Sequence, residues 1–170
     1  KKKKMKKILA FSIVLFAFAA GAFAQSSSAT ATATAVIVSP ITITRTADMS
    51  FGNIVADADG GTVVLVPAGT RTLTGLTSPS LPGTVTAASF TIAGLANATY
   101  AITLPATHDI SNGVQTMTVN TFTSNPSGTG TLDATGNQTL NVGATLNVGA
   151  NQASGTYTNA AGFTVTVNYN

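Results

Sequence analysis

Apolar and polar residues alternate through the stretch at residues 163–170. Phe163, Val165, Val167 and Tyr169 fall on one face of an extended backbone, and threonine and asparagine fall on the other. Successive side chains of a strand point to opposite faces, so this pattern predicts a β-strand with one buried face. A strand this apolar belongs inside a sheet, and we expect a partner on each of its edges.

A second alternating stretch lies near the front of the chain, before Pro40. Its small or apolar positions are Ala29, Ala31, Ala33, Ala35, Val36, Ile37 and Val38, with threonine between the alanines. Proline has no N–H to donate to a ladder and marks a strand edge or a break. We therefore predict an arm at about residues 28–38 and a first domain strand at about residues 41–47.

Many further short stretches have the alternation or the β-branched residues of strands. They lie at about residues 49–55, 63–66, 71–73, 88–93, 99–104, 117–122, 129–132 and 139–148, with turn residues between them. This predicts an all-β fold, a β-sandwich in preference to a barrel. A near-repeat of six residues at 140–151 is interpreted as a bent strand pair or a local duplication, because a β-helix needs at least about three copies.

Residues 1–24 have the pattern of a secretory signal peptide. Lysines fill the first positions, an apolar run follows from Ile8 to Phe18, and small residues lead to Ala24. We expect cleavage after Ala24, with an uncleaved anchor as the alternative. The predicted organisation is a leader at 1–24, an arm at 25–39 and a sandwich domain at 40–170, with no membrane span in the mature form.

Removal of the leader changes the charge of the chain. The formal charge of +3 counts six lysines that all lie in residues 1–7, so without them it becomes −3. A mature chain with two arginines and no lysine has no basic surface for nucleic acid. It also has no cysteine, so burial and strand pairing must stabilise the exported protein without disulfides.

Few residues could carry chemistry, and we predict neither an enzyme nor a cofactor. His108 and Asp109 form the only His–carboxylate pair, but neighbours in a strand face opposite ways and no cysteine or lysine nucleophile accompanies them. We expect His108 in a loop after Pro105. The stretch from Asp57 to Gly61 opens like a calcium loop, yet the chain has no glutamate to complete one, and a hairpin turn is preferred.

The end of the chain resembles a known family of exported proteins. The stretches Gly155-Thr156-Tyr157-Thr158 and 163–169 are similar to the end of spore-coat-protein-U-like pilins, subunits of archaic chaperone–usher pili. Residues 29–43 and 47–52 look like a related family of uncharacterised exported bacterial domains. The resemblance implies an incomplete immunoglobulin-like sandwich that is completed by the N-terminal arm of a neighbouring subunit, which is β-strand addition.

The resemblance assigns roles to the two alternating stretches. Ala29, Ala31, Ala33, Ala35, Val36, Ile37 and Val38 would form the donor arm. Phe163, Val165, Val167 and Tyr169 would form the strand that borders the acceptor groove and meets a periplasmic chaperone before an outer-membrane usher. Two features differ from such pilins, which usually have a disulfide and larger side chains on the arm.

We therefore expect a structural subunit of a cell-surface filament, a homopolymer that forms by donor-strand exchange after transit through the periplasm. Head-to-tail contacts of this kind do not close and so propagate a fibre. The alternative is a self-contained, monomeric surface or adhesion protein whose own arm completes its sheet. An enzyme or a metal protein is the third and least favoured class.

Overall fold

A computed structural model describes residues 25–170, and within them it has strands and no helix. The strands are β1 (Thr42–Ala47), β2 (Ser50–Phe51), β3 (Gly61–Leu65), β4 (Arg71–Thr74), β5 (Val85–Thr86), β6 (Ala88–Ala93), β7 (Thr99–Thr103), β8 (Thr107–Ser111), β9 (Thr116–Asn125), β10 (Thr129–Thr131), β11 (Asn137–Val148) and β12 (Thr166–Tyr169). The expected signal peptide lies outside the described residues. The prediction of an all-β sandwich is confirmed.

Residues 25–36 and residues 37–170 form separate units and are described separately. In residues 25–36 no strand is assigned and every side chain is exposed. All twelve strands belong to the second unit, which we call the domain.

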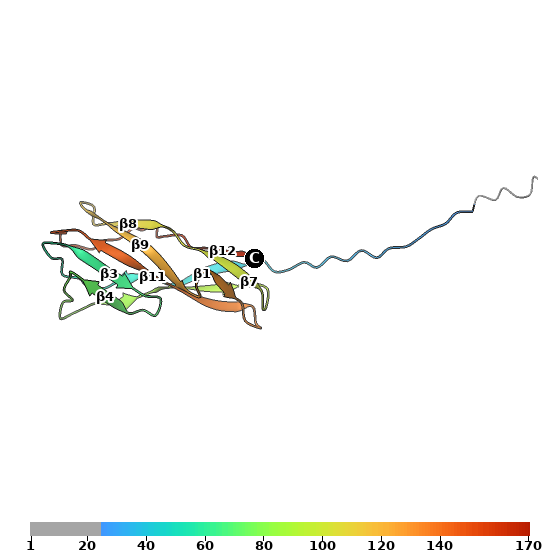
Figure 1. Cartoon of the computed structure of the whole chain (residues 1–170), viewed down its shortest axis with the longest axis horizontal. Helices are drawn as coiled ribbons and strands as arrows, with labels where there is room; N and C mark the ends of the chain where they lie inside the picture. Colours follow the sequence, from blue (N-terminus) through green and yellow to red (C-terminus); the bar gives the residue numbers. More distant parts are fainter. Residues whose placement is uncertain (1–24) are drawn as a thin grey trace, which may run out of the picture. The chain divides into compact units, whose positions relative to one another are not determined.

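The domain is built from antiparallel strands around the long strand β11 (Figure 1). One edge of β11 pairs first with β6 and then with β3, while its other edge pairs with β9. β1 continues this sheet beyond β6, β4 beyond β3, and β8 beyond β9. A smaller sheet has the order β10-β7-β12, and β2 pairs with β5.

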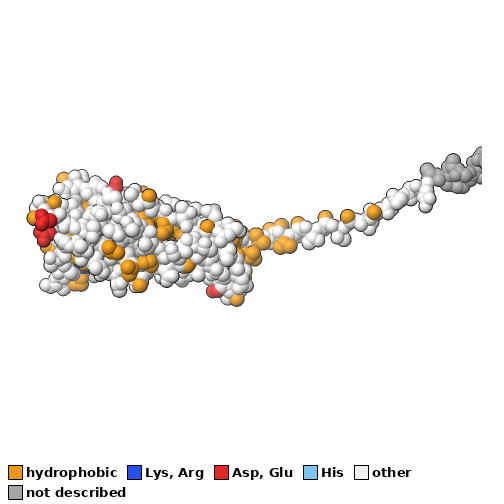
Figure 2. Space-filling view, viewed as in Figure 1, with side chains coloured by type: hydrophobic (Ala, Val, Ile, Leu, Met, Phe, Trp, Pro, Cys, Tyr) orange, Lys and Arg blue, Asp and Glu red, His pale blue; other side chains and the backbone are white. Residues whose placement is uncertain are grey.

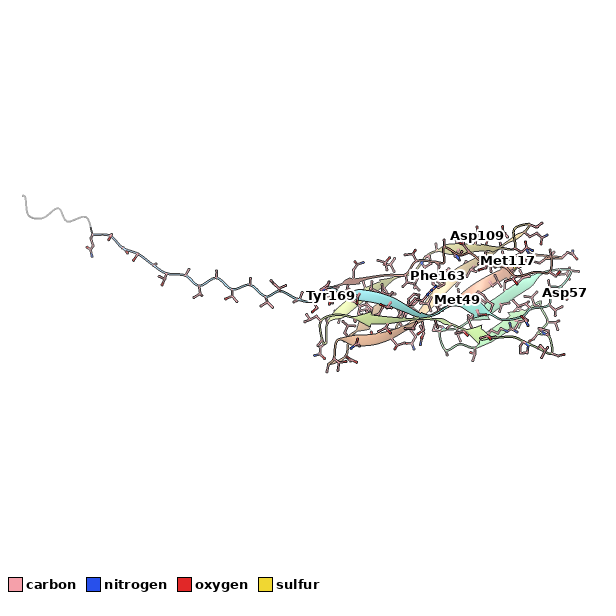
Figure 3. The ribbon with its side chains drawn as sticks, turned by 180° about the vertical axis from the view of Figure 1, so that it is seen from behind. Met49, Asp57, Asp109, Met117, Phe163 and Tyr169 are labelled. Atoms are coloured by element: carbon pink, nitrogen blue, oxygen red, sulfur yellow. The ribbon has the colours of Figure 1, made fainter. Side chains whose placement is uncertain are left out.

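The registers of the antiparallel strand pairs define two ends of the domain. The near end holds the start of β1, the β6–β7 turn and Tyr169; the far end holds Asp57, the β8–β9 turn and the end of β11. Tyr169 and Asp57 lie at opposite ends in Figure 3. The strand β11 therefore runs from the near end of the domain to the far end.

Two hydrophobic clusters fill the domain, and β11 contributes to both. The near core contains Leu140 and Val142 from β11 with residues of β6 and β7, Leu132 just after β10, and Val165 and Val167 near the end of the chain. The far core contains Ala144, Leu146 and Val148 from β11 with residues of β2, β3 and β9. Alternation along one strand therefore supplies both clusters, because every second side chain points inward.

Three predictions of local structure are wrong. A bent strand pair does not form at 140–151, because the near-repeat lies mostly in the single strand β11, where an even period of six keeps the apolar residues on one face. His108 lies in β8, since the stretch from Thr107 pairs with β9. Of the predicted strand at 49–55 only Ser50–Phe51 is formed, because Gly52 adopts a positive φ of 69° and turns the chain.

Candidate functional site: a groove between the first and last strands

The segment from β1 to Val55 forms one wall of a groove and is paired on one side only. β1 pairs with β6, β2 pairs with β5, and Val55 forms a bridge with Thr77. Because β5 almost adjoins β6 in the chain, all of these partners lie on the same side. Within residues 25–170 no strand pairs with the opposite side of this segment.

The segment from Gln152 to Tyr169 supplies the other wall through its residues 152–163, and its strand pairing is also on one side only. β12 pairs with β7, and Thr158 forms a bridge with Ser111 of β8. The second edge of β12 has no strand partner in the part of the chain that the structure describes. β1 and β12 approach one another without hydrogen bonds between their backbones.

A groove of about 1060 Å³ lies between residues 45–56 and residues 152–163. Met117 and Val119 from β9 and Leu146 and Val148 from β11 form its apolar floor, and these side chains also belong to the far core. The groove therefore lies above the far core, with one singly paired backbone segment along each wall. Met49, Met117 and Phe163 lie in the middle of the domain in Figure 3.

Phe163 anchors the last segment where the groove meets the near core. Its ring lies 5.0 Å from that of Phe122, 6.0 Å from His108 and 6.5 Å from Phe90, measured between ring centroids. The contacts with His108 and Phe90 are edge-to-face, an arrangement that aromatic pairs favour. His108 thus packs edge-to-face against Phe163 and lines the groove.

Tyr169 fastens the two walls together at the near end. Its hydroxyl donates to the Ser39 carbonyl at 2.9 Å and accepts the Leu95 N–H at 2.6 Å. Gly94 is required beside it, because a Cβ there would lie 2.2 Å from the Tyr169 hydroxyl. This side chain therefore adds to the β1–β6 and β7–β12 ladders in holding the near end together.

Polar contacts hold the far part of the last segment on the β8–β9 turn. The Gln115 side-chain oxygen accepts the Ala153 N–H at 2.7 Å, and Asn159 donates to the Asp109 carbonyl at 2.9 Å. Tyr157 donates to the Ala153 carbonyl at 2.8 Å and accepts from Gln152 at 3.0 Å. The bonds of Ala153 and Asn159 thus tie this segment to β8 and the β8–β9 turn, while the two Tyr157 bonds lie within the segment.

Arg71 holds the opposite wall in place. Its guanidinium donates to the Phe51 carbonyl and, at 3.2 Å, to the Ser78 hydroxyl. Phe51 is buried in the far core. A single arginine therefore fixes the short strand β2 along the groove.

The groove has little charge of its own. Arg45 and Asp48 form an exposed ion pair at 2.7 Å beside it. Figure 2 shows a face with few charged side chains, with acidic groups gathered at one end. Among the described residues no three His, Cys, Asp or Glu side chains gather where they could hold a metal ion. The floor of the groove is apolar, and its walls also present polar side chains such as Ser50, Asn53 and Gln152.

The last stretch has the exposure pattern that its sequence predicts. Val165 and Val167 are each 8% exposed in the near core, Phe163 and Tyr169 are half-buried, and Thr164, Thr166 and Asn168 are exposed. The residues of the predicted arm are all exposed, with Val36 83% and Ile37 97% accessible. Of the four residues predicted to border an acceptor groove, only Phe163 lines this groove, whereas Val165 and Val167 lie in the near core and Tyr169 packs against it. Pairing of the arm with a groove stays a prediction.

Sequence reasoning missed the opposite wall and the floor of the groove. Met49 and Ile54 were assigned only to a short strand, and Met117 only to another. The alternation of β9 and β11 gave their buried faces, but no local pattern tells which buried residue borders an opening. That information comes from the pairing of segments far apart in the chain.

Within residues 25–170 no helix has the length and hydropathy needed to cross a membrane. No curated protein and no solved structure matches the chain. A family model described as a domain of unknown function, DUF4402, matches residues 41–169, which begin at the first strand of the domain and end with β12. The chain therefore belongs to the DUF4402 family.

Proposed function

We propose that this protein is the structural subunit of an extracellular filament in which the arm of one copy fills the groove of the next. The observation that carries the proposal is the groove itself, which lies above an apolar floor between two backbone segments that are each paired on one side. A strand placed there could hydrogen-bond to both walls. Unpaired strand edges invite the addition of a strand from another chain.

The arm has the composition that such a strand needs. It alternates small or apolar residues with threonine and contains no charge between Gln25 and Ile41. Burial of Ile37 would contribute about 1.5–3 kcal/mol, and the alanine methyl groups about 0.8 kcal/mol each. The side-chain contribution would therefore concentrate at Val36–Val38, and main-chain hydrogen bonds would supply the remainder.

The arm also has the required length. Residues 28–38 in extended form span about 36 Å, and the wall from Thr42 to Val55 spans at most about 45 Å. The arm could therefore cover most of the wall in one pass. A single extended strand would be sufficient, without a turn back along the groove.

Donation between copies and docking of a chain on itself require opposite strand directions. The domain begins at its near end, where Ser39 is bonded to Tyr169. An arm that folds back into its own groove would run antiparallel to β1, with Ile37 near Tyr169. An arm that enters from the far end of another copy would run parallel to β1, with Ile37 near Val55.

Engineered cysteines distinguish the two arrangements, because the chain has no cysteine of its own. We would mix one preparation carrying Ile37→Cys with another carrying Val55→Cys, assemble them together and oxidise them. Val55 is 47% exposed at the far part of the groove. Donation between copies predicts a disulfide that joins the two variants, seen as a dimer on a non-reducing gel.

The matched control replaces Val55→Cys by Thr74→Cys, an exposed residue on β4 away from the groove. No cross-link to Ile37→Cys is expected there. If instead a chain carrying Ala29→Cys and Val55→Cys forms an internal disulfide and stays monomeric, the protein is a self-contained surface domain. Donation between copies is then refuted.

Substitutions in the arm test the same proposal through polymer length. Ile37→Asp should abolish polymers, because a charge would enter an apolar groove without a partner. Ala31→Ser should shorten them less, and Thr32→Ser on the other face should have little effect. Electron microscopy gives the length of the polymers, and size-exclusion chromatography gives the monomer fraction.

A further inference from the structure

Val114 is an exposed valine in a turn that otherwise has typical turn residues. The β8–β9 turn reads Asn112-Gly113-Val114-Gln115, and its valine is 88% exposed. The Asn112 side chain accepts the N–H groups of Val114 and Gln115 at 2.9 and 2.8 Å, so the turn is fixed internally. Turn chemistry explains the asparagine and the glycine, but it does not call for a large apolar side chain between them.

This turn is attached to the far end of the groove. Gln115 accepts the Ala153 N–H at 2.7 Å, and the Asn112 side chain lies where a Cβ on Gly155 would contact it; Ala153 and Gly155 both line the groove. Val114 therefore stands beside the opening through which an arm from another copy would enter.

At the near end, an exposed leucine lies where the arm leaves the domain. Leu95 is 43% exposed, and its N–H binds the same Tyr169 hydroxyl that holds the Ser39 carbonyl. Val38, one residue before Ser39, is 50% exposed. Leu95 therefore lies close to Ser39, the point at which the chain enters the domain.

We propose that Val114 of one copy packs against Leu95 and Val38 of the copy that donates its arm, which makes a second contact between consecutive subunits. This inference rests on the proposed function. If Val36 and Ile37 occupy the far part of the groove, only Val38 separates Ile37 from Ser39, and the chain from Ile37 through Val38 to Ser39 is two residue steps long. Those steps span about 7 Å, so the near end of the donor must meet the far end of the acceptor.

The contact is tested by a second pair of cysteine variants in the full chain. Val114→Cys in one preparation and Leu95→Cys in another should cross-link in polymers, because a disulfide forms only when the two Cβ atoms come within about 4.5 Å. Thr116→Cys, on the adjoining β9 strand and also exposed, replaces Val114→Cys as the control and should cross-link poorly to Leu95→Cys.

The cross-link between Ile37→Cys and Val55→Cys is measured in parallel and separates the two proposals. If it forms in full while Val114 and Leu95 do not cross-link, the second contact is refuted and the filament proposal stands. If neither forms, both are refuted. Val114→Asp gives the functional readout: the polymers should dissociate several-fold faster on dilution, and an unchanged rate would overturn the second contact.

Discussion

The near core and the far core are built on the same strand but are covered differently. The near core lies between the large sheet and the sheet β10-β7-β12, whose strands are joined by continuous ladders. Opposite the large sheet, the far core is covered by β2, which has two residues, and by a segment held through one bridge and side-chain bonds. The groove lies on this side.

The different coverings of the two cores indicate where the domain could accept another strand. Burial alone does not separate the two clusters, because Leu140 is 0% exposed and Leu146 is 2% exposed. The two clusters differ in how completely the segments that cover them are paired into strands. A cluster can be shielded from water by sparse segments and still lie beneath two backbone edges that have no strand partner among the described residues.

The same substitution in both clusters gives the largest expected effect. Leu140→Ala should lower the free energy of unfolding by about 4–5 kcal/mol, and Leu146→Ala by about 2–3 kcal/mol, because a cavity costs less where its surroundings can collapse into it. Urea denaturation of the monomer measures both. Thr139→Ala on the outer face is the control, with a change within about 0.5 kcal/mol. An equal or larger loss for Leu146→Ala would contradict the comparison.

The two arginines beside the groove test how its first wall is held. Arg71→Ala should cost about 1.5–3 kcal/mol, because it removes charged hydrogen bonds to the Phe51 carbonyl and to Ser78. Arg45→Ala should cost at most about 1 kcal/mol, since its ion pair with Asp48 is exposed.

Thermal or urea unfolding of the two variants, measured side by side, gives the difference. Equal losses would mean that Arg71 does not fix β2. A further readout is the yield of the cross-link between Ile37→Cys and Val55→Cys, which should fall in the Arg71→Ala background and stay unchanged with Arg45→Ala.

Alternation allowed much of the fold to be predicted from the sequence. The strands around Phe90, Met117 and Val167 were each located by a period of two, because one of their faces is buried. The failures have physical causes. The strand at 49–55 is interrupted at Gly52, and an even repeat in β11 has the same alternation as an uninterrupted strand.

The site was predictable only in part, because one wall is a single stretch of sequence while the other wall and the floor are not. The last wall is one contiguous stretch that leads into the alternating residues 163–169, so its apolar anchor Phe163 is visible locally. The first wall and the floor combine segments that are distant in sequence, and neither Met49 nor Leu146 has a local mark of bordering an opening.

Tyr169→Phe tests the fastening at the near end. The change removes the hydroxyl that joins Leu95 to Ser39 and should lower the free energy of unfolding by about 0.5–1.5 kcal/mol, as for a typical hydrogen bond. Urea denaturation measures this loss, and Tyr157→Phe at the far end is the matched control for loss of a tyrosine hydroxyl.

The effect on the start of the domain is specific to Tyr169→Phe. Limited proteolysis near Ser39 should become faster in this variant and remain unchanged in Tyr157→Phe. Equal cleavage rates in both would show that Tyr169 does not hold the chain where it enters β1.

The smallest expected effect is a loss of folding stability in acid. It arises at Asp133, at the near end of the domain. Asp133, in the turn before β11, accepts hydrogen bonds from the Asn137 N–H and from the Thr135 hydroxyl and N–H. The bond from the Asn137 backbone, followed by that from the Thr135 side chain, lowers the pKa of Asp133 below its ordinary 3.8. A carboxyl group whose pKa is lower in the folded state stabilises the fold above its unfolded pKa, and the contribution disappears as pH falls through the folded value.

Wild type and Asp133→Asn should therefore differ by a constant amount near neutral pH, and the difference should shrink as the pH falls below 3.8. Unfolding measured by denaturant at a series of pH values gives this profile, and Asp59→Asn in the far turn corrects for the removal of one charge. Because Asp133 orders the turn that leads into Asn137, hydrogen exchange in acid should first become faster at the start of β11. Faster exchange first at its far end, around Val148, would show that acid weakens the sparsely covered half before the closed one.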